Sequence, residues 1–202
     1  MGRLLGGSVN AIPIFGSEGQ IPASIAGLGL EGVERYPDPR LGVMIRYGIP
    51  PWVKADAYLY DMGLSDIPGD LESPQVIELF QESLRGVTMA AEQGIYRDFE
   101  VLQSGYITLP PEAPEPLCLC ASFAYTQNAG AAVPVVFPDR TDTPVISDIG
   151  RLVSHMAFRT DRGYINKVRF NYPEDAGEGG FTGFLNFLVE WTKLVQTAPS
   201  TH

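Results

Sequence analysis

Few side chains in this sequence could act as the base in nucleophilic catalysis. An activated serine or cysteine needs a base within hydrogen-bond reach, and the only histidines are His155 and the C-terminal His202. Ser154 adjoins His155, but neighbouring residues of a strand point to opposite faces of a sheet, so an undistorted strand keeps the two side chains apart. We therefore interpret His155 as a solvent-facing strand residue and predict no catalytic residue.

The cysteines Cys118 and Cys120 lie two positions apart in a segment with strand character. On a strand they would face the same way with Cα atoms about 6.5 Å apart, which disfavours a disulfide between them. They could hold a soft metal if a facing strand supplied a third ligand, but the sequence shows no Cys or His partner. Free cysteines are among the residue types most often buried, so we predict two core residues and no metal ligand.

The glycines of residues 27–32 match the spacing of a dinucleotide-binding fingerprint. That fingerprint needs a preceding strand and a helix that opens inside it, so that the helix N-terminus faces the pyrophosphate. Here Pro37 and Pro39 follow, and no helix begins. The acidic residues between positions 61 and 72 lack the spacing of an EF-hand, and calcium needs six or more converging oxygens. We expect no cofactor and no bound metal.

Basic residues form the one candidate site that the pattern favours. On the predicted C-terminal hairpin His155, Lys167 and Arg169 fall opposite an apolar set, and Arg46 falls opposite the apolar face of an earlier strand. In a chain of net charge −10, this gathers positive charge on one sheet face. Such a face could bind an anion or an acidic partner. The alternative is that the long stems pack under a helix or the charges pair with nearby acids.

Hydrophobic periodicity predicts the elements that carry these residues. Segments with period-two alternation predict strands, namely 41–47, 54–61, 95–109, 117–126, and a hairpin of 152–158 with 164–172. Apolar stripes at helical spacing predict helices over 74–93 and 181–196, the first opened by Ser73-Pro74. In the hairpin we expect Met156 and Phe158 to pack with Val168, Phe170 and Tyr172. The fold class is α+β: an antiparallel sheet of about five or six strands flanked by two main helices.

Composition sets the domain organisation and excludes some partners. Residues 1–32 are rich in Gly, Ser, Ala and Pro and predict an N-terminal arm, followed by one domain over 33–197 and a tail over 198–202. The scattered apolar residues of the arm must pack on the domain or on a second copy, so a homodimer through the arm is one hypothesis. Acidic charge disfavours nucleic acid as a partner, and no apolar run is long enough to span a membrane.

The element order β-β-α-β-β-β-β-α, with a basic hairpin near the end and an aromatic-rich last helix, resembles the PsbP-like α/β/α sandwich superfamily over about residues 33–197. That superfamily has no invariant catalytic motif, so the resemblance implies no functional residue. It implies a bacterial accessory or binding protein. It also slightly favours a periplasmic or exported protein, with its signal removed, over a cytoplasmic one.

A non-enzymatic binding or accessory protein, acting through a protein partner or a small ligand, is the function that these observations favour. Two alternatives stay open: a hydrolase with a site assembled from distant residues, and a carrier of a small apolar ligand. An enzyme needs convergent polar groups and a carrier needs a cavity. The arrangement of side chains in the fold therefore decides between them.

Overall fold

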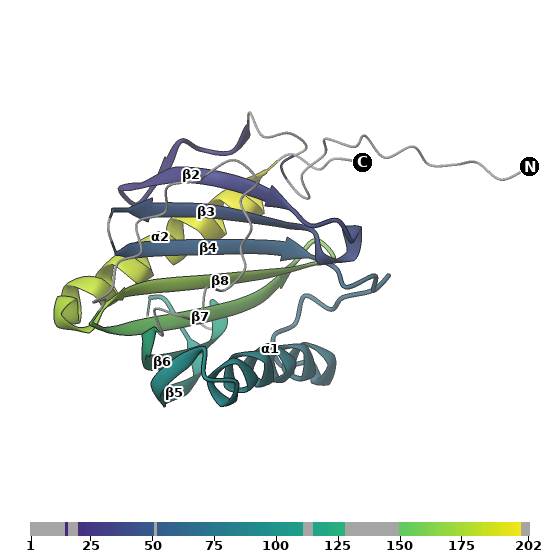
Figure 1. Cartoon of the computed structure of the whole chain (residues 1–202). Coiled ribbons are helices and arrows are strands. Elements are labelled where there is room, and N and C mark those ends of the chain that lie inside the picture. The colour runs from purple at the N-terminus through teal and green to yellow at the C-terminus, as the bar shows by residue number, and fades with distance from the viewer. Residues whose placement is uncertain (1–14, 16–19, 51, 111–114, 128–149, 199–202) are drawn as a thin grey trace, which may run out of the picture.

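The computed structural model of this chain describes residues 15, 20–50, 52–110, 115–127 and 150–198. These residues form an eight-stranded antiparallel sheet with a long helix on each face (Figure 1). The strands are β1 (Ser24–Ile25), β2 (Leu28–Arg35), β3 (Val43–Ile49), β4 (Val53–Tyr60), β5 (Tyr96–Ile107), β6 (Cys118–Gln127), β7 (Arg151–Asp161) and β8 (Tyr164–Pro173). The helices are α1 (Pro74–Glu92) and α2 (Gly177–Thr197).

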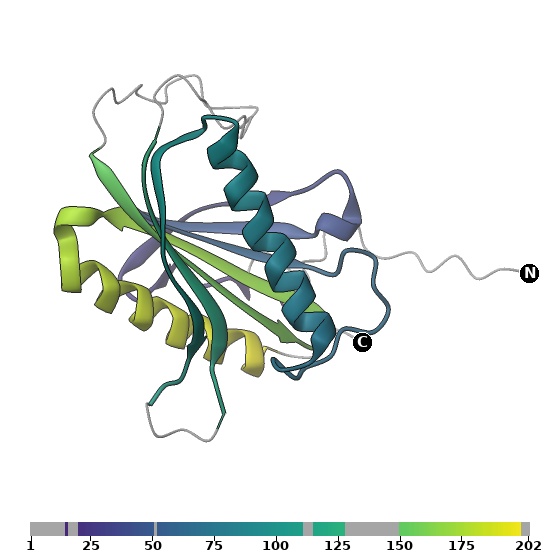
Figure 2. The same ribbon diagram turned by 90° about the horizontal axis from the view of Figure 1, so that it is seen from below.

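The strands are arranged in the order β1-β2-β3-β4-β8-β7-β6-β5. The chain builds one meander from β1 to β4, crosses through α1 to the far edge, and returns through β5, β6 and β7, so that β8 pairs with β4 in the middle. Figure 2 shows the sheet between the two helices. The predicted antiparallel α+β architecture with two main helices is confirmed, but the described sheet has eight strands rather than five or six.

The two additional strands lie in the segment predicted as an arm. β1 and most of β2 fall within residues 1–32, so the predicted boundary at residue 33 lies inside β2. Ile25 and Leu28 are buried, and the backbone N–H of Ala26 donates a 2.8 Å hydrogen bond to Glu190 of α2. The buried apolar residues that the structure describes in this segment therefore pack on their own chain. Gly27, Gly29 and Gly32 obscure the strand pattern, because glycine carries no side chain to show which face is buried.

The helices cover the sheet unequally. The face under α2 carries a core with buried residues from every strand except β5. Trp191 and Phe187 of α2 belong to this core, and their rings stack with centroids 6.3 Å apart. The opposite core, under α1, is drawn from β6, β7 and one end of β8, and Phe80 contacts Phe158 there. Ser73 caps α1 by accepting a hydrogen bond from the N–H of Val76. Because α1 packs over the β5–β7 half, neither of the two described helices covers the side chains of β3 on that face (Figure 1).

The register of the C-terminal hairpin differs from the predicted one. Residues directly opposite in an antiparallel pair share a face, and the structure pairs Met156 with Arg169, Phe158 with Lys167, and His155 with Phe170. Met156 and Phe158 therefore lie under α1, whereas the other predicted members of their cluster lie under α2. The predicted packing was wrong because β7 is buried on both faces, so alternation along β7 could not indicate which set faces which helix.

Candidate functional site

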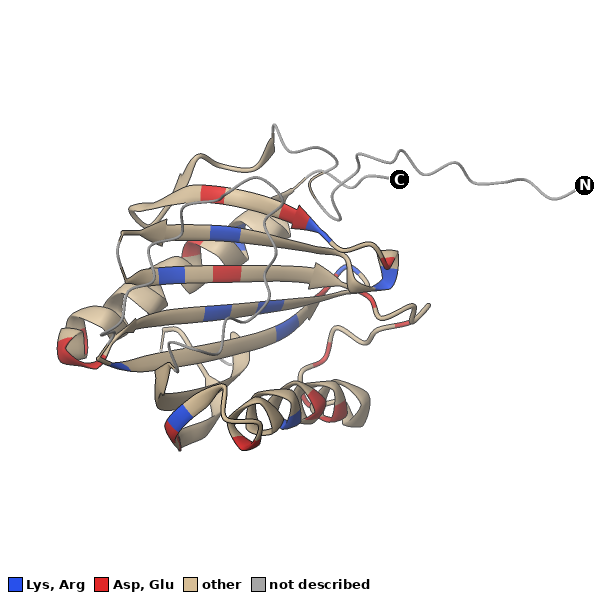
Figure 3. Ribbon diagram, in the orientation of Figure 1, with Lys and Arg blue, Asp and Glu red and all other residues tan. Residues whose placement is uncertain are grey.

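The structure brings three of the four predicted basic residues onto one sheet face and removes the fourth. Arg46, Lys167 and Arg169 lie on the face that α1 partly covers. Figure 3 shows Lys and Arg positions along the central strands of the sheet. The register places Arg46 opposite Asp56, and Asp56 opposite Arg169. His155 lies on the other face, so its predicted place in this surface is corrected.

His155 is buried in a hydrogen-bonded network beneath α2. Its Nδ1 lies 2.7 Å from the hydroxyl of Ser122, and its Nε2 lies 2.9 Å from the hydroxyl of Tyr172. The imidazole stacks on Phe184 with centroids 4.5 Å apart, and its exposed fraction is only 4%. Burial lowers the pKa of His155 to about 4. The predicted solvent-facing position is therefore wrong, and a neutral, weakly basic imidazole in the core is a structural group.

Sequence reasoning had compared His155 with the adjacent Ser154, and the structure keeps those two on opposite faces as predicted. The serine that does meet the histidine is Ser122, on β6, and only the β6–β7 register brings the two together. Cys118 and Cys120 are both buried beneath α2, which confirms the prediction of two core residues. No group of three metal-ligating side chains occurs among the residues that the structure describes.

Arg169 is held rigidly by three hydroxyl groups. Its Nε donates to Ser154 at 3.1 Å, its Nη1 to Tyr96 at 2.8 Å, and its Nη2 to Tyr125 at 3.5 Å. The guanidinium carbon also lies 5.2 Å from the Tyr96 ring and 5.7 Å from the Tyr125 ring, within the range of cation–π attraction. The cation is thus fixed by neutral groups. Asp56, the acid opposite it in the register, pairs with Arg46 at 2.6 Å instead.

Lys167 lies two residues before Arg169 on β8, opposite Tyr58 of β4. Its amine is 4.7 Å from the ring centroid of Tyr58 and 5.5 Å from that of Tyr60. Within the described ranges no carboxylate lies at ion-pair distance from this amine. Burial, with a smaller contribution from the positive charge of Arg169, lowers the pKa of Lys167 to about 8.

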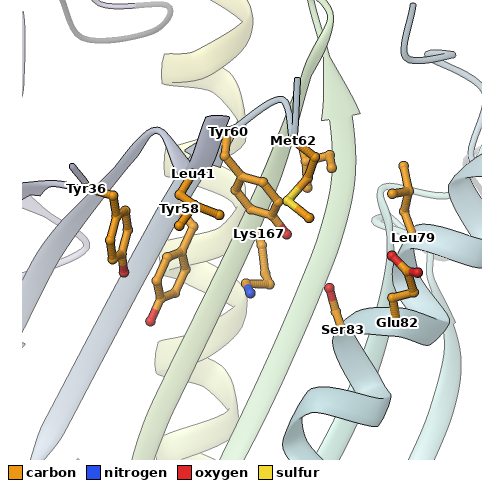
Figure 4. A pocket seen from close by; sticks show the side chains of 10 residues that line it. Tyr36, Leu41, Tyr58, Tyr60, Met62, Leu79, Glu82, Ser83 and Lys167 are labelled. Atoms are coloured by element: carbon orange, nitrogen blue, oxygen red, sulfur yellow. The ribbon is translucent and has the colours of Figure 1, made fainter. Parts of the chain in front are cut away.

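A cleft between α1 and strands β4 and β8 contains the Lys167 amine. One hollow, of about 290 Å³, has tyrosines on its sheet side, Glu82 and Ser83 on its helix side, and an aliphatic mouth formed by Leu41, Met62 and Leu79. A second hollow, of about 260 Å³, shares Lys167 with the first and extends to Arg169 beneath Gly86 of α1. We call the two together the α1 cleft. Figure 4 shows the amine of Lys167 between β4 and α1, with Ser83 facing it from the helix.

The tyrosines of the α1 cleft are hydrogen-bond donors across the physiological pH range. Burial raises the pKa of Tyr60 to about 12 and also raises the pKa of Tyr58. Neutral phenols can donate to an anion without adding negative charge. Sequence reasoning missed these residues, although the alternation in residues 54–60 places Lys54, Asp56, Tyr58 and Tyr60 on one face. That alternation was the available signal, but it indicated only a half-buried strand.

Comparison with known proteins does not assign this chain to a family. No protein family, curated protein or solved structure matches the chain. The resemblance to the PsbP-like superfamily therefore stays a prediction. Among the described residues, neither helix has the length and apolar character needed to cross a lipid bilayer.

Proposed function

We propose that this protein is a non-enzymatic binding protein that holds a small anionic ligand in the α1 cleft. One observation carries the proposal: two neighbouring cations, Lys167 and Arg169, face the cleft without a carboxylate partner in the described part of the chain. A buried charge is costly unless it is paired. A ligand carboxylate or phosphate would supply the missing partner.

The walls of the α1 cleft define the rest of the ligand. Small-molecule sites are mostly apolar with a few placed polar groups, and typically span about 300–1,000 Å³. The larger hollow, at about 290 Å³, suits a compact molecule. Its aliphatic mouth at Leu41, Met62 and Leu79 suits an apolar or aromatic body, while Lys167 and Arg169 lie deeper along the sheet. A purely apolar ligand, the carrier alternative, would leave both cations unpaired.

The wider role is an extension of this binding function. A bacterial accessory protein, periplasmic or exported, is the role that the PsbP-like resemblance supports. Ligand binding in the α1 cleft would let such a protein respond to a small molecule. The hydrolase alternative gains no support from Ser122 and His155, because that pair is buried in the core under α2.

Isothermal titration with benzoate and with benzyl alcohol tests the proposal, since the two probes share a ring and differ in charge. We expect benzoate to bind and benzyl alcohol to bind at least about tenfold more weakly. Lys167→Met and Arg169→Met should each weaken benzoate binding by about tenfold or more, because a hydrogen bond to a charged group contributes about 1.5–3 kcal/mol.

The matched control is Lys54→Met. Lys54 lies on β4 on the same sheet face but is exposed and does not line the α1 cleft. Its substitution removes the same charge and should leave benzoate binding within about twofold, since an exposed charge interacts weakly through water. Equal binding of benzyl alcohol and benzoate, or equal losses in all three variants, would contradict the anion site.

A further inference from the structure

The Lys167 amine is in a different environment from the other lysines. The other lysines of the chain, Lys54 and Lys193, are exposed and lie outside the α1 cleft. Lys167 instead lies beside the aromatic rings of Tyr58 and Tyr60, with a second cation two positions along its own strand. An enclosed amine next to another cation is the arrangement that makes a lysine a nucleophile at near-neutral pH.

Arg169 retains hydrogen-bonding capacity for a ligand. A guanidinium has five N–H groups, and three of them are directed at Ser154, Tyr96 and Tyr125. One N–H on each terminal nitrogen is left, so the guanidinium can still donate two hydrogen bonds to a ligand carboxylate. Because residues two apart on a strand face the same way at roughly 6.5 Å, the amine of Lys167 and these N–H groups can contact adjacent groups of one compact molecule.

We propose that Lys167 forms a reversible imine with the carbonyl group of a small 2-oxo acid whose carboxylate is bound by Arg169. This inference rests on the proposed anion-binding function and names the ligand class. The neutral amine attacks the carbonyl carbon, so that a C–N bond forms, the C–O double bond becomes single, and one proton passes from nitrogen to oxygen to give a carbinolamine. The proton released when the ammonium became neutral then protonates the hydroxyl, the C–O bond breaks, and water leaves as the protonated imine forms. The balance is one ammonium and one carbonyl converted to one iminium and one water, without an oxidant or reductant.

The lowered basicity of the amine supports the step. Only the neutral amine is nucleophilic, and an ordinary lysine with a pKa of about 10.4 is roughly 0.4% neutral at pH 8. Lys167, with a pKa lowered to about 8 by burial and by Arg169, is about half neutral at that pH. The neutral fraction is therefore larger by roughly a hundredfold.

Reductive trapping on the wild-type full chain tests the inference. The protein is incubated at pH 8 with glyoxylate and cyanoborohydride, which converts an imine to a stable secondary amine, and the modified lysines are quantified by peptide mass spectrometry. We expect Lys167 to be modified at least about tenfold faster than Lys54 and Lys193, which serve as internal controls in the same sample. Acetaldehyde, which has the carbonyl but no carboxylate, should keep the part of this preference that comes from the larger neutral fraction of Lys167 and lose the part that comes from Arg169.

Arg169→Met tests the carboxylate contact separately. Within that variant the ratio of glyoxylate to acetaldehyde labelling at Lys167 should fall towards the ratio measured at the exposed Lys54, and this ratio does not depend on the pKa of the amine. Gly86→Leu offers a second variant if the first does not fold, because Gly86 lines the hollow next to Arg169 and a Cβ there meets no atom within 4 Å. That variant should slow labelling of Lys167 while leaving Lys54 unchanged.

The outcomes separate this inference from the proposed function. Equal labelling of the three lysines overturns the imine at Lys167, and a glyoxylate-to-acetaldehyde ratio at Lys167 equal to that at Lys54 overturns the 2-oxo acid as its ligand. If benzoate binds and Lys167 is not trapped, this inference fails while anion binding stands. If Lys167 is trapped with glyoxylate but benzoate does not bind, the inference stands and the α1 cleft is too narrow for an aromatic ring.

Discussion

The hydroxyl of Tyr96, the first residue of β5, accepts a 2.8 Å hydrogen bond from Arg169 on β8, and the guanidinium carbon lies 5.2 Å from the ring of the same tyrosine. In the sheet, β5 and β8 are separated by β6 and β7. The contact therefore crosses two strands on the face under α1. It joins an edge strand to the centre of the sheet and fixes the inner end of the α1 cleft.

Tyr96→Phe removes the hydroxyl and keeps the ring. We expect the free energy of unfolding to fall by about 1–2 kcal/mol, because a hydrogen bond to a charged group contributes more than a neutral one. In a background of Arg169→Met the same change should cost less than about 0.5 kcal/mol, since its partner is already gone. Urea denaturation of the four proteins of this double-mutant cycle measures the coupling. Additive losses would show that the two side chains do not act together.

His155 should make the stability of the fold depend on pH between about 4 and 6.5. Burial lowers the pKa of His155 to about 4 in the folded state, whereas an unfolded histidine has a pKa near 6.5. The unfolded state therefore binds the proton first as pH falls, and stability is lost across this window, by on the order of 2–3 kcal/mol at pH 4. The groups that touch the ring are Ser122, Tyr172, Phe181 and Phe184, and none of them carries charge at these pH values.

His155→Gln isolates this contribution from that of the carboxylates, which titrate in the same range. We expect the variant to be less stable than the wild type at pH 7, because Ser122 and Tyr172 lose their partner. Between pH 6.5 and 4, however, its free energy of unfolding should fall less steeply. Denaturant titrations at four pH values give both slopes, and parallel slopes would contradict a buried neutral imidazole.

The sequence predicted the helices and six of the strands because each has a strong local pattern. Ser73-Pro74 predicted the start of α1 at its observed residue, and the stripe from Phe181 to Val195 predicted most of α2. β1 and β2 were missed because Gly27, Gly29 and Gly32 interrupt the alternation of a segment that pairs with β3 through its backbone. Backbone pairing leaves little trace in a sequence when the side chains are small.

Part of the candidate site could be predicted and part could not. Lys167 and Arg169 share a face by simple alternation, so their proximity was predictable from β8 alone. Their enclosure by Tyr58, from β4, and Tyr96, from β5, depends on β8 inserting beside β4. His155 was misplaced because its strand is buried on both faces, and a face cannot be assigned from alternation when neither face is polar.

Two neighbouring glycines at the start of α2 should respond oppositely to substitution by alanine. A Cβ at Gly179 meets no atom within 4 Å, whereas a Cβ at Gly180 would lie 2.1 Å from the ring of Tyr172. In a helix, alanine is more favourable than glycine by about 1 kcal/mol, so Gly179→Ala should raise the melting temperature by about 2–4 °C. Gly180→Ala must displace Tyr172, and overpacking of this kind costs about 1–3 kcal/mol.

Calorimetric melting of both variants tests the close approach of α2 to β8. The expected result is a higher melting temperature for Gly179→Ala and a lower one for Gly180→Ala. Since Tyr172 also binds His155, the second variant should in addition weaken the pH dependence described above. A rise in melting temperature for both variants would mean that Tyr172 moves away without cost.

Replacing Lys167 by methionine should stabilise the protein at neutral pH, although it removes the central group of the α1 cleft. Burial and the neighbouring Arg169 lower the pKa of Lys167 to about 8, below the ordinary lysine value near 10.4. The unfolded chain therefore binds this proton more tightly, and wild-type stability is reduced below pH 8 and recovers as pH rises from 8 to about 10.4. That difference in pKa lowers the free energy of unfolding of the wild type by roughly 3 kcal/mol below pH 8. The cation–π contacts with Tyr58 and Tyr60 offset about 0.5–2 kcal/mol of this loss.

The free energy of unfolding of Lys167→Met should thus exceed that of the wild type by about 1–2 kcal/mol at pH 7, and this advantage should disappear near pH 10.5. Urea denaturation at both pH values measures it. Lys54→Met, an exposed change on the same face, should show neither effect, and a destabilised Lys167→Met at pH 7 would mean that Lys167 is already paired in the folded protein.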